Sequence, residues 1–200
     1  MIISASNESS HNIELSNIQN WAKRNNLNLN CDKSSEILFA DSKRRQWHMN
    51  ELSPLPRIVH CHSLKMLGVI IGDDFSVAQH IQRLVTSSAR THYALRVLRC
   101  HGLNAAALQH VYRTTVVACL TYAASAWHSF TKASERQRID KVMDCARRLG
   151  YYPPDAPTFG DLCDTMDDKL FSKVRLWSNH VLHTLLPPLS AASQRYNFRP

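Results

Sequence analysis

The hydrophobic periodicity of the chain changes near Phe75. Before it, apolar and β-branched residues form short runs bounded by polar or proline-containing segments, as in SEILFA (Ser35 to Ala40) and LKMLGVIIG (Leu64 to Gly72). Such runs favour β-strands, and Arg57 to Cys61 is a candidate third strand. After Phe75, apolar residues recur at three- and four-residue steps, which is typical of amphipathic helices. The sequence therefore predicts an α+β fold in which strands precede helices.

The helical part contains predicted helices over residues 77–100, 104–127, 135–149 and 167–186. Ser134 with Gln137 predicts a capping box at the start of the third. The predicted core stripe of the second helix is Leu108, Val111, Tyr112, Thr115, Cys119 and Tyr122. The predicted core stripe of the fourth is Leu170, Val174, Trp177, Val181 and Leu185.

The N-terminal part adds an amphipathic helix from about Ser10 to Asn25, with one side formed by Leu15, Ile18, Trp21 and Ala22. We therefore expect residues 1–75 to hold one helix and two or three antiparallel strands, and residues 76–150 to form a basic helical region. Residues 151–188 should form the C-terminal helices, and residues 189–200 a poorly ordered tail.

The positive charge of the chain is regional. The formal net charge is +8, and the segment from Ser76 to Gly150 holds eleven lysines and arginines against three acids, while the other residues balance thirteen against thirteen. A positive field confined to one segment suits a surface that follows the phosphates of a nucleic acid. A solvated basic surface without a partner is the alternative.

Two predicted helices carry these cations at helical spacing. Arg138, Lys141 and Arg148 recur at i, i+3 and i+10, away from the apolar positions of their helix. Arg83 and Arg90 are seven residues apart on an earlier helix. These five residues are the candidate nucleic-acid contacts.

Motifs for catalysis or metal binding are incomplete. Gly72-Asp73-Asp74 resembles the metal-binding turn of viral RNA polymerases, but the outgoing segment FSVAQHI predicts a helix, and two-metal chemistry needs a third converging carboxylate. We interpret it as a polar turn near a helix N-terminus. Phe39-Ala40-Asp41-Ser42 resembles a reverse-transcriptase box without its last acid. The pairs His60/His62 and Asp167/Asp168 lack further ligands at recognisable spacing.

Compartment signals are weak. The six cysteines show no C-x-x-C spacing, which favours reduced, buried thiols over disulfides or zinc ligands. No run approaches the roughly 20 apolar residues of a membrane span, and the N-terminus lacks signal-peptide features. We expect a cytoplasmic or nuclear chain without a membrane partner.

Two blocks in this order resemble one family. W-A-x-x-N-x-L-x-L-N-x-x-K-S (Trp21 to Ser34) and LKMLGVIIGDDFSVAQHI (Leu64 to Ile81) are similar to stretches that follow the catalytic box in reverse transcriptases of non-LTR, LINE-type, Jockey-like retrotransposons. LTYAASAW, HVLHTLLPP and QRYNFRP, later in the chain, are similar to tick transposon copies. The resemblance covers nearly the whole chain.

The resemblance implies a place within that polymerase. The opening MIIS would follow the catalytic Tyr-Ala-Asp-Asp box, so the metal-binding aspartates would lie outside the sequence. Lys33 matches the lysine of palm motif D, which is implied to assist nucleotide closure or pyrophosphate departure. Leu67 and Gly68 lie at the turn-prone centre of a primer-grip-like segment. The strands would be a palm-edge remnant, and the following helices a thumb-like bundle.

The expected function is template-primer binding without polymerisation by this chain alone. The partners would be an RNA template and a DNA primer, contacted through phosphates, with no small-molecule substrate. No cofactor is expected in the fragment, whereas the full-length family enzyme is expected to use Mg²⁺. A stand-alone basic nucleic-acid-binding module and an inert retroelement remnant are the alternatives.

Overall fold

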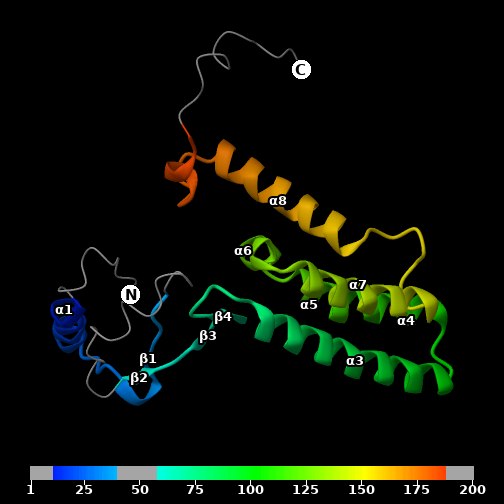
Figure 1. The fold of residues 1–200 in the computed structure, drawn as a ribbon, viewed down its shortest axis with the longest axis horizontal. Helices are drawn as coiled ribbons and strands as arrows, with labels where there is room; N and C mark the ends of the chain where they lie inside the picture. Colours follow the sequence, from blue (N-terminus) through cyan, green and yellow to red (C-terminus); the bar gives the residue numbers. More distant parts are fainter. Residues whose placement is uncertain (1–10, 40–57, 188–200) are drawn as a thin grey trace, which may run out of the picture. The chain divides into compact units, whose positions relative to one another are not determined.

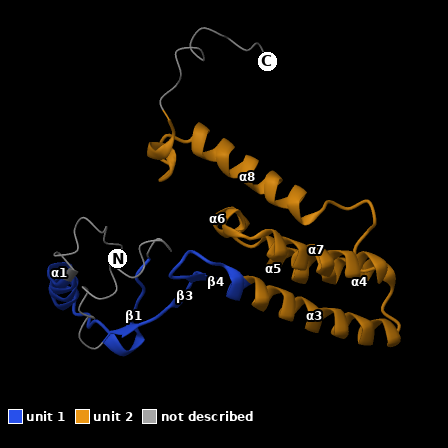
Figure 2. Cartoon of the chain, viewed as in Figure 1, with its two compact units in different colours: residues 1–80 blue, residues 81–200 orange. Residues whose placement is uncertain are grey.

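The computed structural model describes residues 11–39 and 58–187. The chain divides into two compact units, residues 1–80 and residues 81–200 (Figure 2). The predicted tail, residues 189–200, and the Asp41 and Ser42 positions of the Phe-Ala-Asp-Ser box lie outside the described residues.

The first unit begins with helix α1 (His11–Arg24), as predicted. Leu15 and Ala22 are buried, whereas Trp21, predicted on the same side, is largely exposed. The chain leaves the helix at Asn26, which adopts a positive φ of 55°. Asparagine tolerates this left-handed conformation better than most residues, so it suits the end of a helix. A short 3-10 turn, η2 (Cys31–Lys33), follows.

The strands of the first unit form two separate pairs. β3 (Ser63–Met66) and β4 (Val69–Gly72) make an antiparallel hairpin. β1 (Ser35–Glu36) and β2 (Val59–His60) pair in parallel, so the prediction that all strands are antiparallel is wrong. A two-residue connection can only reverse the chain, but the long segment between β1 and β2 permits a parallel crossover. The run from 64 to 72, predicted as one strand, is this hairpin.

The second unit contains nearly all of helix α3 (Ala78–Cys100), close to its predicted range, and the helical segments that follow it in Figure 1. α4 (Ala105–Tyr112) begins at Asn104, whose side chain accepts a hydrogen bond from the Ala107 N–H at 2.8 Å. After α4 come η3 (Arg113–Val117), α5 (Ala118–Thr121), α6 (Ala124–Trp127) and η4 (His128–Phe130). The predicted helix 104–127 is therefore interrupted.

A π-helical turn explains why the predicted core stripe of that helix is wrong beyond Tyr112. η3 is a π-helix, in which each turn holds an extra residue, so the inward-facing positions move along by one. Val116 and Leu120 are buried in place of Thr115 and Cys119, which are exposed. The helix then breaks at Ala123, where φ is 51°.

Helix α7 (Ala133–Arg148) matches its predicted range to within two residues. Its predicted capping pair, Ser134 with Gln137, is wrong by two positions. The Glu135 carboxylate accepts a hydrogen bond from the backbone N–H of Lys132 at 2.8 Å, so the helix is capped at Lys132. Glu135 is buried in this arrangement.

Helix α8 (Phe159–Leu176) differs most from its prediction. It begins eight residues before the predicted start, because Thr158 and Asp161 form a capping box. The Asp161 carboxylate accepts a hydrogen bond from the Thr158 N–H at 2.8 Å, and the Thr158 hydroxyl accepts one from the Asp161 N–H at 3.2 Å. It ends at Leu176, before Ser178 and Asn179, which favour turns. Of its predicted stripe, Val174 is buried, and Trp177, Val181 and Leu185 are exposed. The 3-10 turn η5 (His183–Leu185) follows.

The core of the second unit joins α8 to the segments before α7. Trp127 and Phe159 are fully buried and their rings stack with centroids 6.1 Å apart. The Trp127 indole N–H donates to the Tyr122 carbonyl at 3.0 Å. A buried stacked pair with its polar atom satisfied fixes the start of α8 against α6. Among the described residues, no helix combines the length and apolar character needed to cross a membrane.

Candidate nucleic-acid interface

Helix α3 separates its buried side chains from its arginines. Ile81, Leu84 and Leu95 are buried, whereas Arg83 and Arg90 are exposed. Successive residues of an α-helix are about 100° apart around the axis, so the two arginines lie on nearly the same side, opposite the core. The outer surface of α3 therefore carries both predicted contacts.

Helix α7 carries both cations and acids on its exposed surface. At about 100° per residue, Lys141 and Arg148 lie on the outer surface and Arg138 on one flank of the buried side. Asp140 lies on the other flank, and Asp144 is three residues from Lys141 and four from Arg148, so it neighbours both. Burial and the neighbouring Asp144 raise the pKa of Asp140 above its ordinary value. Of the two α7 acids, Asp140 thus lies on the flank opposite Arg138.

Two side-chain contacts link α3 to α7 and to the residue that follows it. The Arg138 guanidinium donates a hydrogen bond to the Gln82 side-chain oxygen, beside Arg83, and Arg99 of α3 donates to the Leu149 carbonyl just after α7. These contacts show that the two helices run in the same direction within the second unit, as Figure 1 illustrates. We call the five predicted contacts on these two helices the basic face: Arg83, Arg90, Arg138, Lys141 and Arg148.

The cations of the basic face differ in exposure and in the contacts that they make within the protein. Within the described ranges, Lys141 and Arg148 form no ion pair, and both are exposed. Arg138 is half-buried, and part of its hydrogen-bonding capacity is used on Gln82. Arg147, by contrast, pairs with Asp144 at 2.9 Å. Of the three α7 cations in the basic face, Lys141 and Arg148 therefore have the most capacity for an external anion.

Two further arginines hold the segment that follows α7. The Arg99 guanidinium lies 4.5 Å from the Tyr151 ring centroid, and Arg147 lies 5.3 Å from that of Tyr152 and donates to the carbonyls of Ala156 and Pro157. These contacts stabilise the fold instead of offering free charge. The sequence signal for these two cation–π contacts is the pair of tyrosines in Gly-Tyr-Tyr-Pro-Pro (Gly150 to Pro154).

Tyr93 and Arg96 are not among the residues predicted from charge spacing. Tyr93 is 64% exposed on α3, and the Arg96 guanidinium lies 5.5 Å from its ring centroid. The signal in the sequence is an aromatic residue at i+3 from Arg90, because residues three apart are neighbours on a helix. The spacing of charged residues alone does not reveal an uncharged ring on the same helix.

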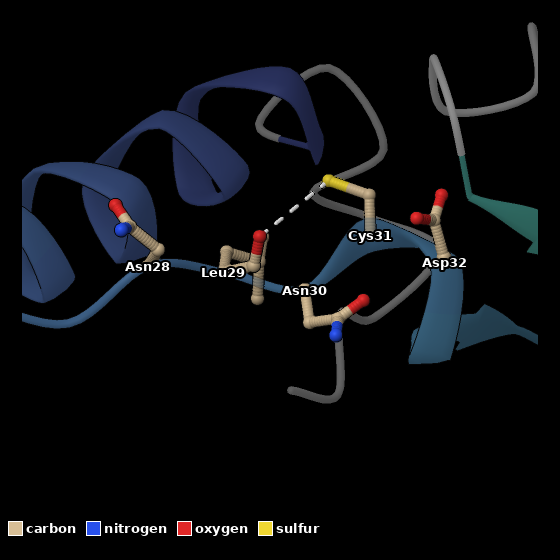
Figure 3. A pocket seen from close by; sticks show the side chains of 5 residues that line it. All are labelled: Asn28, Leu29, Asn30, Cys31 and Asp32. Carbon is tan, nitrogen blue, oxygen red and sulfur yellow. Dashed lines mark hydrogen bonds between the residues drawn. The ribbon is translucent and has the colours of Figure 1, made fainter.

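Lys33 lies in the first unit, at the end of η2, and is exposed. Its backbone N–H donates to the Asn30 side-chain oxygen at 3.1 Å. The shallow depression beside it is lined by one continuous stretch, residues 28–32, in which the Cys31 sulfur lies 4.0 Å from the Leu29 carbonyl oxygen (Figure 3). Among the described residues, a single stretch therefore lines this depression.

Leu67 and Gly68 form the tip of the β3–β4 hairpin. Both have positive φ, 46° for Leu67 and 94° for Gly68, which is the geometry of a type I′ turn. The turn predicted at this position is thus present. Leu67 is 91% exposed. A bulky apolar residue in the left-handed region costs free energy, and this hairpin tolerates it at its tip.

The Gly72-Asp73-Asp74 sequence forms a turn before α3. The buried Asp73 carboxylate lies 2.8 Å from His62 Nδ1, and the Asp74 carboxylate accepts a hydrogen bond from the Ser76 N–H at 2.9 Å. This is the polar turn expected from sequence. In the described part of the chain, no three histidine, cysteine or acidic side chains are grouped so that they could hold a metal ion.

The remaining predicted pairs and cysteines are dispersed. His60 lies 3.5 Å from Glu36, and its ring meets that of His62 at 90°. All six cysteines are free thiols, as predicted, but only Cys163 is buried. Cys31, Cys61 and Cys145 are half-buried, and the prediction of burial is wrong for the exposed Cys100 and Cys119. They lie on helix sides that α3 and the π-helical turn direct to solvent.

Comparisons with protein-family models, with curated proteins and with solved structures return no match to this chain.

Proposed function

We propose that this chain is the C-terminal part of a non-LTR retrotransposon reverse transcriptase and that its basic face holds the phosphate backbone of a template-primer. The proposal rests on one observation above the others: exposed cations recur along both α3 and α7, and Arg138 links the two helices through its hydrogen bond to Gln82. The family and the palm and thumb roles come from the resemblance of Trp21 to Ser34 and Leu64 to Ile81.

The distribution of charge favours an extended anion. Arg83 and Arg90 are separated by about 10 Å along α3, and Arg138 and Arg148 by about 15 Å along α7, at 1.5 Å per residue. A small anion is bound by groups that converge on one point, whereas a nucleic-acid backbone is contacted at successive phosphates. Such contacts position a duplex without selecting its sequence.

In this proposal the first unit contributes contacts, not catalysis. The exposed Leu67 at the hairpin tip has the geometry of a residue presented to a partner, as a primer grip requires, and Lys33 is the motif D lysine. The two Mg²⁺ ions of the family reaction would need carboxylates from the preceding part of the polymerase.

Salt dependence of duplex binding tests the proposal. The affinity of the 200-residue chain for a primer-template duplex should fall steeply between 50 and 200 mM salt, because each neutralised phosphate releases counterions. Affinity that barely changes over about this range would contradict phosphate binding.

Primer extension tests the second part of the proposal. With a primed RNA template, nucleotides and Mg²⁺ or Mn²⁺, the chain alone should incorporate no nucleotide. Template-dependent incorporation would contradict it. The genomic frame upstream of Met1 tests the family itself, since a Tyr-Ala-Asp-Asp box should lie immediately before it.

A stand-alone nucleic-acid-binding module is the second candidate, favoured by the compactness of residues 81–200 as a separate unit. It predicts the same salt dependence. Unrelated coding sequence or a promoter upstream of Met1 would favour it over the polymerase fragment.

A further inference from the structure

The exposed tyrosine of α3, Tyr93, neighbours Arg90 of the basic face. Tyr93 is eleven residues beyond Gln82, so it lies on nearly the same side of α3 as the residue that contacts α7, three turns further along. Arg90 precedes it by three residues and Arg96 follows it by three. Around the axis of α3, the Tyr93 ring therefore lies between Gln82, which contacts Arg138, and Arg90.

The ring is held, and it is accessible. The Arg96 guanidinium lies 5.5 Å from the ring centroid, a cation–π contact that orients the tyrosine. The residue nevertheless remains 64% exposed. Exposed aromatic rings beside cations are the pattern of single-strand binding surfaces, where a base stacks on the ring and the flanking phosphates meet the charges.

We propose that Tyr93 is a stacking site for an unpaired base of single-stranded nucleic acid, with Arg90 and Arg96 contacting the phosphates on either side. The three residues follow one another at about 4.5 Å along the helix axis, so one nucleotide and its neighbours lie along this part of α3. This inference rests on the proposed nucleic-acid function and adds a contact that base-paired duplex cannot make, since its bases are already stacked.

Base removal combined with mutation tests the site. The full chain is titrated, at one fixed low salt concentration, with oligothymidylate, with an abasic oligomer of equal length and charge, and with a duplex. Tyr93→Leu should weaken binding to oligothymidylate roughly tenfold, the typical loss for one stacked base, and leave the other two affinities unchanged. Oligouridylate should respond like oligothymidylate, because stacking uses the face of the base, which RNA and DNA share.

Two variants control the experiment. Phe171→Leu changes an exposed aromatic residue of α8, outside the basic face, and should leave all affinities unchanged. Tyr93→Trp keeps an aromatic face and should retain oligothymidylate binding, which a merely structural role of the tyrosine hydroxyl would not allow.

The outcomes separate this inference from the function beneath it. Two results of Tyr93→Leu would overturn base stacking on Tyr93: equal weakening of the oligothymidylate, abasic and duplex complexes, or no weakening of any of them. In either case, salt-dependent binding by the wild-type chain would still support the proposed nucleic-acid function. Absence of salt-dependent binding by the wild-type chain would overturn both.

Discussion

Individual residues of this chain show how burial and backbone geometry set local properties. His92 of α3 packs against Tyr112 and Tyr151, with ring centroids 5.6 and 6.0 Å away, and its Nε2 is buried without a hydrogen-bond partner in the described structure. Burial lowers the pKa of His92 below its ordinary value. Burial is the cause of this shift, and no carboxylate contributes to it by stabilising a protonated His92 ring. The folded state therefore favours the neutral ring.

The stability of the chain should therefore decrease on acidification through His92. The unfolded chain binds the His92 proton near the ordinary value of 6.5, and the folded chain only at lower pH. The contribution of neutral His92 is complete above that value and is lost as pH falls toward the folded pKa. Urea unfolding at pH 7.5, 6.5 and 5.5 should show a smaller loss for His92→Gln than for wild type. Parallel curves for the two proteins would contradict this linkage.

The thiols should differ in reactivity. Burial, with Asp167 and Asp164 nearby, raises the pKa of Cys163 to about 11, so it is protonated at neutral pH. Because the thiolate is the reactive form, Cys163 should resist iodoacetamide in the folded chain, whereas the exposed Cys100 and Cys119 should be modified. Mass spectrometry of digested peptides measures this. Modification of Cys163 at the rate of Cys100 would contradict its burial.

Leu67 should be replaceable with a gain in hairpin stability. Asparagine followed by glycine is the preferred pair of a type I′ turn, and leucine is disfavoured at positive φ. Leu67→Asn should stabilise the hairpin by about 1 kcal/mol, or roughly a fivefold increase in hydrogen-exchange protection of its paired amides. If Leu67 contacts the primer, the same variant should weaken duplex binding. Reduced protection would show that the turn geometry is different.

Among elements, helices with strong local signals were predicted well. α3 and α7 match because their apolar positions repeat regularly and their ends carry clear stop signals, such as Gly102 and Gly150, which adopt positive φ. The π-helical turn η3 and the break at Ala123 could not be predicted, because their sequence has no glycine or proline. The parallel pairing of β1 with β2 depends on distant contacts that strand patterns do not encode.

Helix α8 shows the limit of periodicity most clearly. Trp177, Val181 and Leu185 continue the spacing of a helix, yet α8 ends before them and they are exposed. A Thr-x-x-Asp pattern in the sequence indicates the cap at Thr158, whereas the spacing of the apolar residues predicts a later start. Local capping thus determined the start of α8 and turn-forming residues its end.

The two tryptophans of this region provide the corresponding test. Trp127→Ala removes a fully buried ring that stacks on Phe159 and should destabilise the chain by about 3–5 kcal/mol. Trp177→Ala changes an exposed residue and should cost less than about 0.5 kcal/mol. Denaturant unfolding of both variants measures this difference. A large loss for Trp177→Ala would restore the longer helix expected from sequence.

At the scale of the whole molecule, the sequence predicts candidate site residues but not how their helices are arranged. Helical spacing identified Arg83, Arg90, Arg138, Lys141 and Arg148. Helical spacing could not show that contacts link α3 to α7, because this depends on tertiary packing. Nor could it show that the Arg138 guanidinium donates a hydrogen bond to Gln82. It also left open which arginines hold the fold, a role that Arg99 and Arg147 perform through backbone carbonyls.

The basic face is the central claim, and a matched pair of triple variants measures it most directly. Arg83→Gln, Arg90→Gln and Lys141→Gln together remove three charges from it, while Lys169→Gln, Lys173→Gln and Arg175→Gln remove three exposed charges from α8. In each, the slope of log affinity against log salt is measured with one duplex. We predict that the first set flattens the slope by about 2.7, at about 0.9 for each lost phosphate contact, and that the second leaves it unchanged. Equal slopes for the two sets would contradict a phosphate-binding surface on α3 and α7.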